Sequence, residues 1–317
     1  MSSATAGGSE GAAPPQLKPT QRPTVTQAVE ELVRATVDLS DTAMGRTWVW
    51  REYDEEGLRF TLLLAQHELR DLAVRLAALR AADGPPVTQA ERILGQYHRA
   101  YRDLTGALAG VGDRDLDRAP AKDQWPVRAV IEHMLGAEYG FLGVVQYARA
   151  ADRPHDDDEA RARYQAWRAE HGYRAPETVA GGIADVRNAL FEIHRRILRE
   201  LADVGDDELE RPALFWDGAK PVRFRMHRFE AHLVQHTIQV DKTLVAIGCG
   251  PTEAHRLIRV LYRDLADVEV LGSSAFGESE RKAVASAISD RAREIAPPVS
   301  PPTRAGRRRR SPRRRRP

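Results

Sequence analysis

Two histidines, His232 and His236, stand four residues apart in the last third of the 317-residue chain. On an α-helix this spacing stacks both imidazoles on one face. Phe229 and Val240 share that face, so we expect the pair to point into the protein rather than into solvent. Because a neutral imidazole nitrogen is a good ligand for divalent metal ions, the pair predicts part of a metal site.

A third ligand must come from another stretch of the chain, and His133 is the best candidate. It lies on the apolar stripe of a predicted helix, between Val130 and Ala137. A lone histidine on such a stripe is more often a hydrogen-bonded core residue than a ligand, and a His-x-x-x-His pair alone is a weak signal. The zincin pattern His-Glu-x-x-His is absent because Leu233 occupies the place of its glutamate, so a metalloprotease is not supported.

Three other residues could take part in chemistry by their type, but their positions in the sequence are better explained by structural roles. His227 precedes His232 by five residues, about 140° away around a helix, and should miss the site. His194 lies beside a strongly apolar stripe and is expected in the core. Cys249 stands between two glycines after a predicted helix, which is typical of a helix end.

The elements that must position these histidines are helices. Aromatic residues make up 6% of the chain, whereas alanine, leucine, arginine and glutamate are plentiful, which favours helices over sheets. Apolar residues recur every three or four positions in eight segments. Their ranges are 25–39, 58–79, 88–112, 125–144, 179–204, 222–246, 252–271 and 277–295. The polar stretch 151–177 should be partly helical, and Phe215 to Gly218 reads as a tight turn between two short strands.

This pattern predicts an all-α protein with a four-helix bundle at 88–250. Residues 25–82 form an N-terminal helical extension and residues 251–296 form C-terminal helices. Residues 1–24, rich in glycine, alanine and proline, and the arginine-rich residues 297–317 are expected to be disordered tails.

The cysteine count and the lengths of the apolar runs exclude several classes of protein. A single cysteine excludes an internal disulfide, a zinc site built from cysteines and an iron–sulfur cluster, and it fits the reducing cytoplasm. No apolar run approaches the roughly 20 residues of a membrane span, and the first residues do not resemble a signal peptide. We therefore expect a cytoplasmic protein that contacts no membrane.

The positive net charge of the chain comes from the arginines near its end, whereas the rest of the chain is acidic. The chain carries +2, but nine arginines lie between positions 304 and 316, and subtracting these nine positive charges leaves −7 for the rest. Such a block attracts phosphates, so a nucleic-acid contact through 304–316 is one interpretation. A solvated tail without a partner is the other, because no aromatic residue is interleaved for base stacking.

Two stretches together resemble the signatures of the DinB/YfiT-like superfamily of metal-dependent four-helix bundles. The first begins with Trp125, continues through an apolar run to His133, and has Glu138 five positions later. The second contains the two histidines four apart and Gln239 three residues beyond them. The resemblance covers about 88–250, whereas 25–82 and 252–296 have no counterpart in it.

The resemblance implies a divalent metal, most commonly zinc or nickel, held by His133, His232 and His236. It also implies a small-molecule substrate and a low-molecular-weight thiol cosubstrate, with a metal-dependent thiol S-transferase or a related transferase or isomerase as the activity. The catalytic group would be a metal-bound water or thiol. The alternatives are a non-catalytic helical binding or stress-associated protein and a nucleic-acid-associated protein. The helical extensions leave the oligomeric state undetermined, and a homodimer is one of the assemblies they would allow.

Overall fold

The computed structural model describes residues 23–150, 158–271 and 277–296, and within them the fold is all-α, as predicted. Eleven α-helices, one short 3-10 helix and a two-stranded hairpin account for the regular structure of this part. None of the described helices combines the length and the apolar character needed to cross a bilayer. Of the predicted disordered tails, 1–24 and 297–317, residues 1–22 and 297–317 lie outside the described part, whereas Thr24 caps the first helix.

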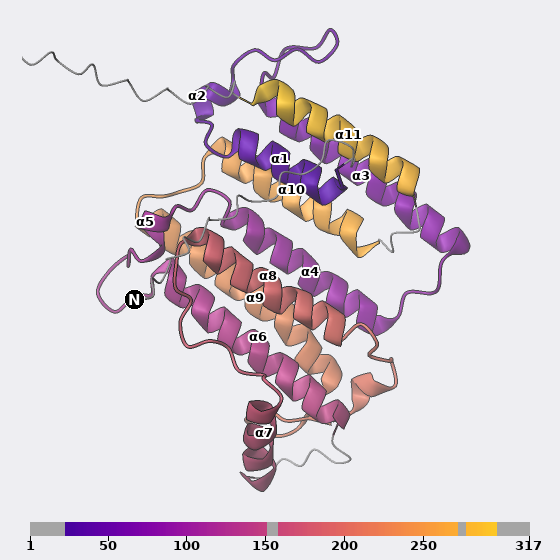
Figure 1. Cartoon of the computed structure of the whole chain (residues 1–317), viewed down its shortest axis with the longest axis vertical. Helices are drawn as coiled ribbons and strands as arrows, with labels where there is room; N and C mark the ends of the chain where they lie inside the picture. Colours follow the sequence, from indigo (N-terminus) through magenta and orange to yellow (C-terminus); the bar gives the residue numbers. More distant parts are fainter. Residues whose placement is uncertain (1–22, 151–157, 272–276, 297–317) are drawn as a thin grey trace, which may run out of the picture.

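Four long helices form the bundle that carries the histidines. They are α4 (Gln89–Ala107), α6 (Val127–Ala150), α8 (Ile183–Glu200) and α9 (Val222–Ala246). Helix α9 packs on α4 and α6, and α8 closes the other side against the same two helices (Figure 1). The apolar stripes of all four meet in one continuous core, in which Tyr97 and Phe229 are fully buried. The position of each histidine is therefore set by helix-on-helix packing.

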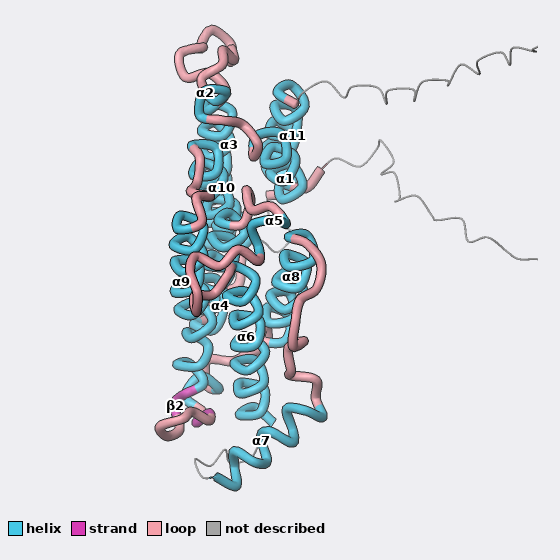
Figure 2. The backbone as a smooth tube through the Cα atoms, turned by 90° about the vertical axis from the view of Figure 1, so that its left-hand side faces the viewer, coloured by secondary structure: helices cyan, strands magenta, loops and turns pink. Residues whose placement is uncertain are grey.

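Short elements close the ends of this bundle. Helix α5 (Asp113–Leu116) follows α4, and α7 (Asp158–Glu170) extends away from the end of α6. Strands β1 (Pro212–Ala213) and β2 (Lys220–Pro221) follow η1 (Glu208–Glu210) and lead directly into α9. The hairpin lies at the same end of the molecule as α7 (Figure 2), whose Arg161 donates hydrogen bonds to the carbonyls of Phe215 and Trp216.

The two flanking extensions combine into a second four-helix layer. Its members are α1 (Val25–Thr36), α3 (Arg59–Asp83), α10 (Glu253–Val270) and α11 (Glu278–Ile295), with the short α2 (Asp41–Met44) at one end. Helix α1 packs on α11, and α3 packs on α10 and α11, around a separate apolar core. Segments from opposite ends of the chain therefore bury each other's apolar faces (Figure 1).

Helix α10 joins the two layers by packing along α4. Gly106 marks their closest approach, because a Cβ atom at this position would stand 2.8 Å from the Cα of Arg259. Around the contact, Arg259 pairs with Asp103 of α4 and with Asp241 of α9 at 2.7 Å each. A glycine and an arginine thus place a helix of the second layer directly against the histidine-bearing bundle.

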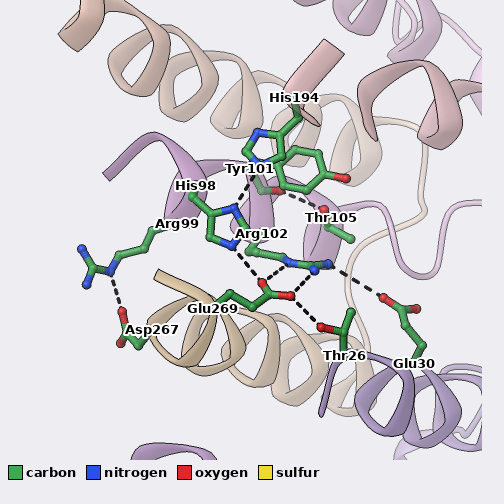
Figure 3. A network of polar contacts seen from close by, with 10 residues as sticks. All are labelled: Thr26, Glu30, His98, Arg99, Tyr101, Arg102, Thr105, His194, Asp267 and Glu269. Carbon is green, nitrogen blue, oxygen red and sulfur yellow. Dashed lines mark hydrogen bonds and ion pairs between the residues drawn. The ribbon is translucent and has the colours of Figure 1, made fainter. Parts of the chain in front are cut away.

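A buried polar network spans the same junction (Figure 3). The Glu269 carboxylate of α10 accepts hydrogen bonds from Arg102 Nε at 2.7 Å, His98 Nε2 at 2.8 Å and Thr26 Oγ1 at 2.8 Å. The other nitrogen of His98, Nδ1, lies 2.9 Å from His194 Nε2. This junction network, defined as Thr26, His98, Arg102, His194 and Glu269, links α1, α4, α8 and α10.

Some local details differ from the sequence prediction. The first helix ends at Thr36 rather than Leu39, and α6 starts at Val127, with the Pro126 carbonyl accepting the bond from Val130 N. The two short strands are present, but Ala213 pairs with Lys220, which leaves six residues, 214–219, between them. The predicted tight turn is therefore a wider loop.

Candidate metal centre

Three histidines from two helices converge at the interface of α6 and α9. The possible ligand nitrogens of His133, His232 and His236 all lie within 4.8 Å of one another. The ring centroids are 5.1 Å apart for His133 and His232, 4.6 Å for His133 and His236, and 4.3 Å for His232 and His236. We refer to these three residues as the histidine cluster.

The spacing of the two α9 histidines explains why both enter the cluster. His232 and His236 are one helical turn apart, and both are buried together with Phe229 and Val240. The expectation that this face points into the protein is therefore confirmed. His133 comes from the first turns of α6, which packs on α9, so the packing of two amphipathic helices brings distant parts of the chain together.

His133 lies at the edge of its helix's buried stripe rather than within it. Val130 and Met134 are fully buried, whereas the His133 side chain is exposed. The indole of Trp125, itself 46% exposed, lies against the His133 ring with centroids 5.2 Å apart. The sequence placed His133 on the apolar stripe, and the correction matters because the exposed edge gives the histidine cluster an open side.

The contacts of the buried rings define which nitrogens are available. His236 Nδ1 lies 2.7 Å from Gln239 Oε1, which fixes Nδ1 as the protonated nitrogen and leaves the Nε2 lone pair free. His232 Nε2 lies 3.2 Å from His133 Nε2. The inner side of the cluster is apolar, since the Phe141 ring meets His232 edge-on at 5.4 Å.

Burial and the neighbouring rings favour the neutral form of His133 and His232. Burial is the main cause that lowers the pKa of His232, to about 3, and the neighbouring His236 and His133 add to it. Burial and His236 also lower the pKa of His133. The cluster of potential ligands contains no carboxylate among the described residues. The neutral imidazole is the form in which histidine binds metals.

The donor set and spacing fit a divalent ion. Two histidine ligands of a tetrahedral zinc, each at about 2.0–2.1 Å, are separated by roughly 3.3 Å, close to the His133–His232 nitrogen separation of 3.2 Å. Imidazole suits zinc, nickel, copper and iron, whereas calcium and magnesium prefer oxygen ligands. The residues present therefore fit a soft or borderline divalent metal, which the three histidines would hold.

The remaining candidate residues are separate from the cluster. His227 is exposed on α9, outside the cluster, and His194 is buried in the core, both as expected. Cys249 follows the end of α9, where its N–H donates to the Leu244 carbonyl, and its thiol lies 3.4 Å from Asp115 Oδ1. Its interpretation as a helix-end residue is consistent with these contacts.

Sequence reasoning missed the role of Trp125 beside His133 and the junction network. A motif search can identify Trp125 only as a helix-start residue, because its contact depends on the loop that precedes α6. The network draws on four helices, so no local spacing signals it.

Comparison with known proteins agrees with the geometry of the bundle. A family model described as DinB superfamily matches residues 96–240, which contain all three histidines and most of α4, α6, α8 and α9. Neither the curated proteins nor the solved structures compared with the chain include a match. Over residues 96–240, the bundle that carries the histidine cluster is therefore similar to the DinB superfamily.

Proposed function

We propose that His133, His232 and His236 bind one divalent metal ion, zinc or nickel, and that the chain is a metal-dependent transferase acting on a small molecule with a low-molecular-weight thiol as cosubstrate. The observation that carries this proposal is the convergence of three imidazoles, whose possible ligand nitrogens lie within 4.8 Å of one another, in the region that matches the DinB superfamily. The open side at His133 supports a catalytic centre, because structural sites are closed by four protein ligands.

A divalent ion held by three imidazoles would lower the pKa of a bound water or thiol and so supply a nucleophile near neutral pH. The chain's own residues prepare the place for it. Gln239 orients the His236 ring, because its Oε1 atom accepts a hydrogen bond from His236 Nδ1. Phe141 and Phe229 exclude water from the inner side, where they lie 5.7 Å apart at a near-right angle. The Trp125 side remains open for the substrate.

The proposal is tested with a thiol S-transfer assay on the purified full chain, with a panel of electrophilic small molecules and low-molecular-weight thiols. We expect activity that is lost with a chelator and restored by zinc or nickel. The His232→Ala variant should be inactive, because removal of one ligand leaves two. The His227→Ala variant serves as the matched control, since His227 is an exposed histidine on the same helix outside the cluster.

A metal-loaded chain that transfers no thiol in this panel would contradict the transferase and favour the non-catalytic binding protein. Activity that persists in the His232→Ala variant would contradict the assignment of the site itself.

A further inference from the structure

An open pocket adjoins the histidine cluster on its exposed side. Its volume is about 600 Å³, which lies in the range of 300–1,000 Å³ that is usual for small-molecule sites. The loop before α6 and the last turns of α9 line it, through Asp123, Gln124, Trp125, His236, Gln239 and Lys242. We refer to it as the Trp125 pocket. The pocket borders the histidine cluster, because His236 belongs to both.

Lys242 supplies the ammonium group of this pocket. It is exposed on α9, and no carboxylate of the described residues forms an ion pair with it. Lys242 follows His236 by six residues, about 9 Å along the helix axis at 1.5 Å per residue. A side chain four carbons long with a free ammonium, placed at this distance, can hold the far end of a molecule whose near end lies at the cluster.

The charge balance of the pocket also favours an anion. Asp123 and Lys242, two residues with opposite formal charges, both line the pocket. Three neutral ligands do not compensate the two positive charges of a divalent metal ion. With the metal bound, the pocket is therefore cationic and attracts anionic ligands.

The local backbone and the indole shape the opposite wall. Asp123 has a φ angle of +68°, a conformation that residues other than glycine rarely adopt and that concentrates at functional sites. The bend precedes Gln124 and Trp125, and the indole lies against His133. An exposed indole beside a polar pocket offers an apolar face on which a flat group can stack.

We propose that the Trp125 pocket binds a carboxylate-bearing small molecule, with its carboxylate paired to the Lys242 ammonium and a flat apolar portion against Trp125. This inference rests on the proposed function, which places the reacting group at the histidine cluster. It adds the chemical class of the substrate and makes Lys242 the residue that determines specificity.

The test compares an acid with its neutral counterpart. Binding of 3-phenylpropionate and of 3-phenylpropanamide to the zinc-loaded full chain is measured by calorimetry. We expect the acid to bind about tenfold more tightly than the amide, the size of a charge-assisted hydrogen bond that is partly solvated. The Lys242→Gln variant should lose this preference, and the Lys242→Arg variant should retain most of it. The Trp125→Leu variant should weaken both ligands alike.

The matched control is Lys122→Gln, because Lys122 is an exposed lysine of the same loop that does not line the pocket. It should keep the preference of the wild-type chain. Equal binding of acid and amide to the wild-type chain, or binding of neither, overturns the inference. A preference that persists in Lys242→Gln and disappears when zinc is removed also overturns it, because the metal would then hold the carboxylate.

The metal content of the same samples separates this inference from the function on which it rests. Lys242→Gln should contain as much zinc as the wild-type chain, since Lys242 is no member of the histidine cluster. A wild-type chain that binds no zinc but prefers the acid through Lys242 contradicts the metal-dependent function and supports the pocket assignment. A zinc-loaded chain without the preference contradicts only the pocket assignment.

Discussion

At the scale of single residues, the histidine cluster depends on one amide. The Gln239 Oε1 atom accepts a hydrogen bond from His236 Nδ1 at 2.7 Å and thereby leaves the Nε2 lone pair available to a metal. Such outer partners orient metal-ligating histidines and raise their basicity. His232 lacks an equivalent, because its buried Nδ1 has no hydrogen-bond partner among the described residues. Among the residues outside the cluster, Gln239 is therefore the one whose loss should reduce the metal affinity most.

Replacing Gln239 with alanine should weaken metal binding about 10- to 100-fold, because the His236 ring loses its fixed tautomer and orientation. Competition with a chromophoric chelator measures the change in metal affinity. Gln235→Ala is the matched control, since Gln235 is an exposed glutamine one turn earlier on α9. An unchanged affinity in Gln239→Ala would show that the hydrogen bond does not act on the metal site.

The sequence predicted which histidines meet, and the physical reason is periodicity. The four-residue spacing places His232 and His236 on one face whatever else the helix does. The exposure of His133 was missed because it depends on how α6 is rotated against α9. The contact of His133 with Trp125 was missed for a similar reason, since it depends on the loop before α6.

At the scale of elements, helices α4 and α10 approach each other closely enough to need a glycine. A Cβ atom at Gly106 would stand 2.8 Å from the Arg259 Cα and 3.2 Å from its Cβ. Backbone atoms cannot rotate away as the end of a flexible side chain can, so the two helices would have to separate. The ion pairs of Arg259 with Asp103 and Asp241 would be strained by the same movement.

The Gly106→Ala variant should lower the free energy of unfolding by about 1–2 kcal/mol. Overpacking costs about 1–3 kcal/mol, and the higher helix propensity of alanine offsets as much as about 1 kcal/mol of it. Urea denaturation measures the difference. Gly140→Ala on α6 is the control, because a Cβ atom there would meet nothing within 4 Å, and it should stabilise the chain slightly. Equal effects of both substitutions would contradict the close approach.

The existence of the long helices was predictable, and their ends less so. Strong apolar periodicity identified α4, α6, α8 and α9. In the structure, the Thr88 side chain accepts a hydrogen bond from Glu91 N at 3.1 Å at the start of α4. The helix over 25–39 was predicted too long, because Leu39 continues the apolar spacing although the helix has already ended at Thr36. The apolar periodicity identifies the buried face of a helix, but it does not show where the last backbone hydrogen bond of the helix lies.

At the scale of the whole molecule, the junction network ties the flanking helices to the histidine-bearing bundle. Glu269 is mostly buried and satisfies Arg102, His98 and Thr26 at once. Although burial raises the pKa of a carboxyl group, the bonds from His98 and Arg102 outweigh it and lower the pKa of Glu269 to about 2. The charged carboxylate is thus favoured by the folded state.

The Glu269→Gln variant should lower the free energy of unfolding at pH 7 by about 2–4 kcal/mol, because the mostly buried Arg102 guanidinium loses its ion pair with Glu269 and keeps only the longer contact with Glu30, at 4.0 Å. Urea denaturation measures this change. Asp267→Asn is the matched control, since Asp267 lies two residues earlier on α10 and forms an exposed ion pair with Arg99. The Asp267→Asn variant should lower the free energy of unfolding by less than about 1 kcal/mol. Comparable losses in both variants would contradict the buried network.

The acid stability of the chain follows from the same carboxylate. The pKa of Glu269 is lower in the folded state than in the unfolded state, so its contribution is complete above about pH 4.5 and is lost as the pH falls toward 2. The full contribution is about 3 kcal/mol. The wild-type chain should therefore lose its advantage over Glu269→Gln across this window. Parallel stability curves of the two proteins between pH 5 and pH 3 would contradict this origin.

The pairing of the two flanks could not be predicted from the sequence. Each flank shows an apolar stripe that needs a partner, but nothing in the spacing of Leu69 or Ile288 says that the partner lies some 200 residues away. Long-range packing of this kind depends on the path of the whole chain. The division into extensions and bundle stays a prediction, whereas the two separate cores are features of the structure.

The most direct test of the metal centre is the metal content of the purified chain after reconstitution with zinc or nickel and removal of unbound ions. We expect one metal ion per chain in the wild type and in His227→Ala, and none in His236→Ala. A wild-type chain that retains no metal, or a His236→Ala variant that retains as much as the wild type, would contradict the central claim that the histidine cluster is a metal site.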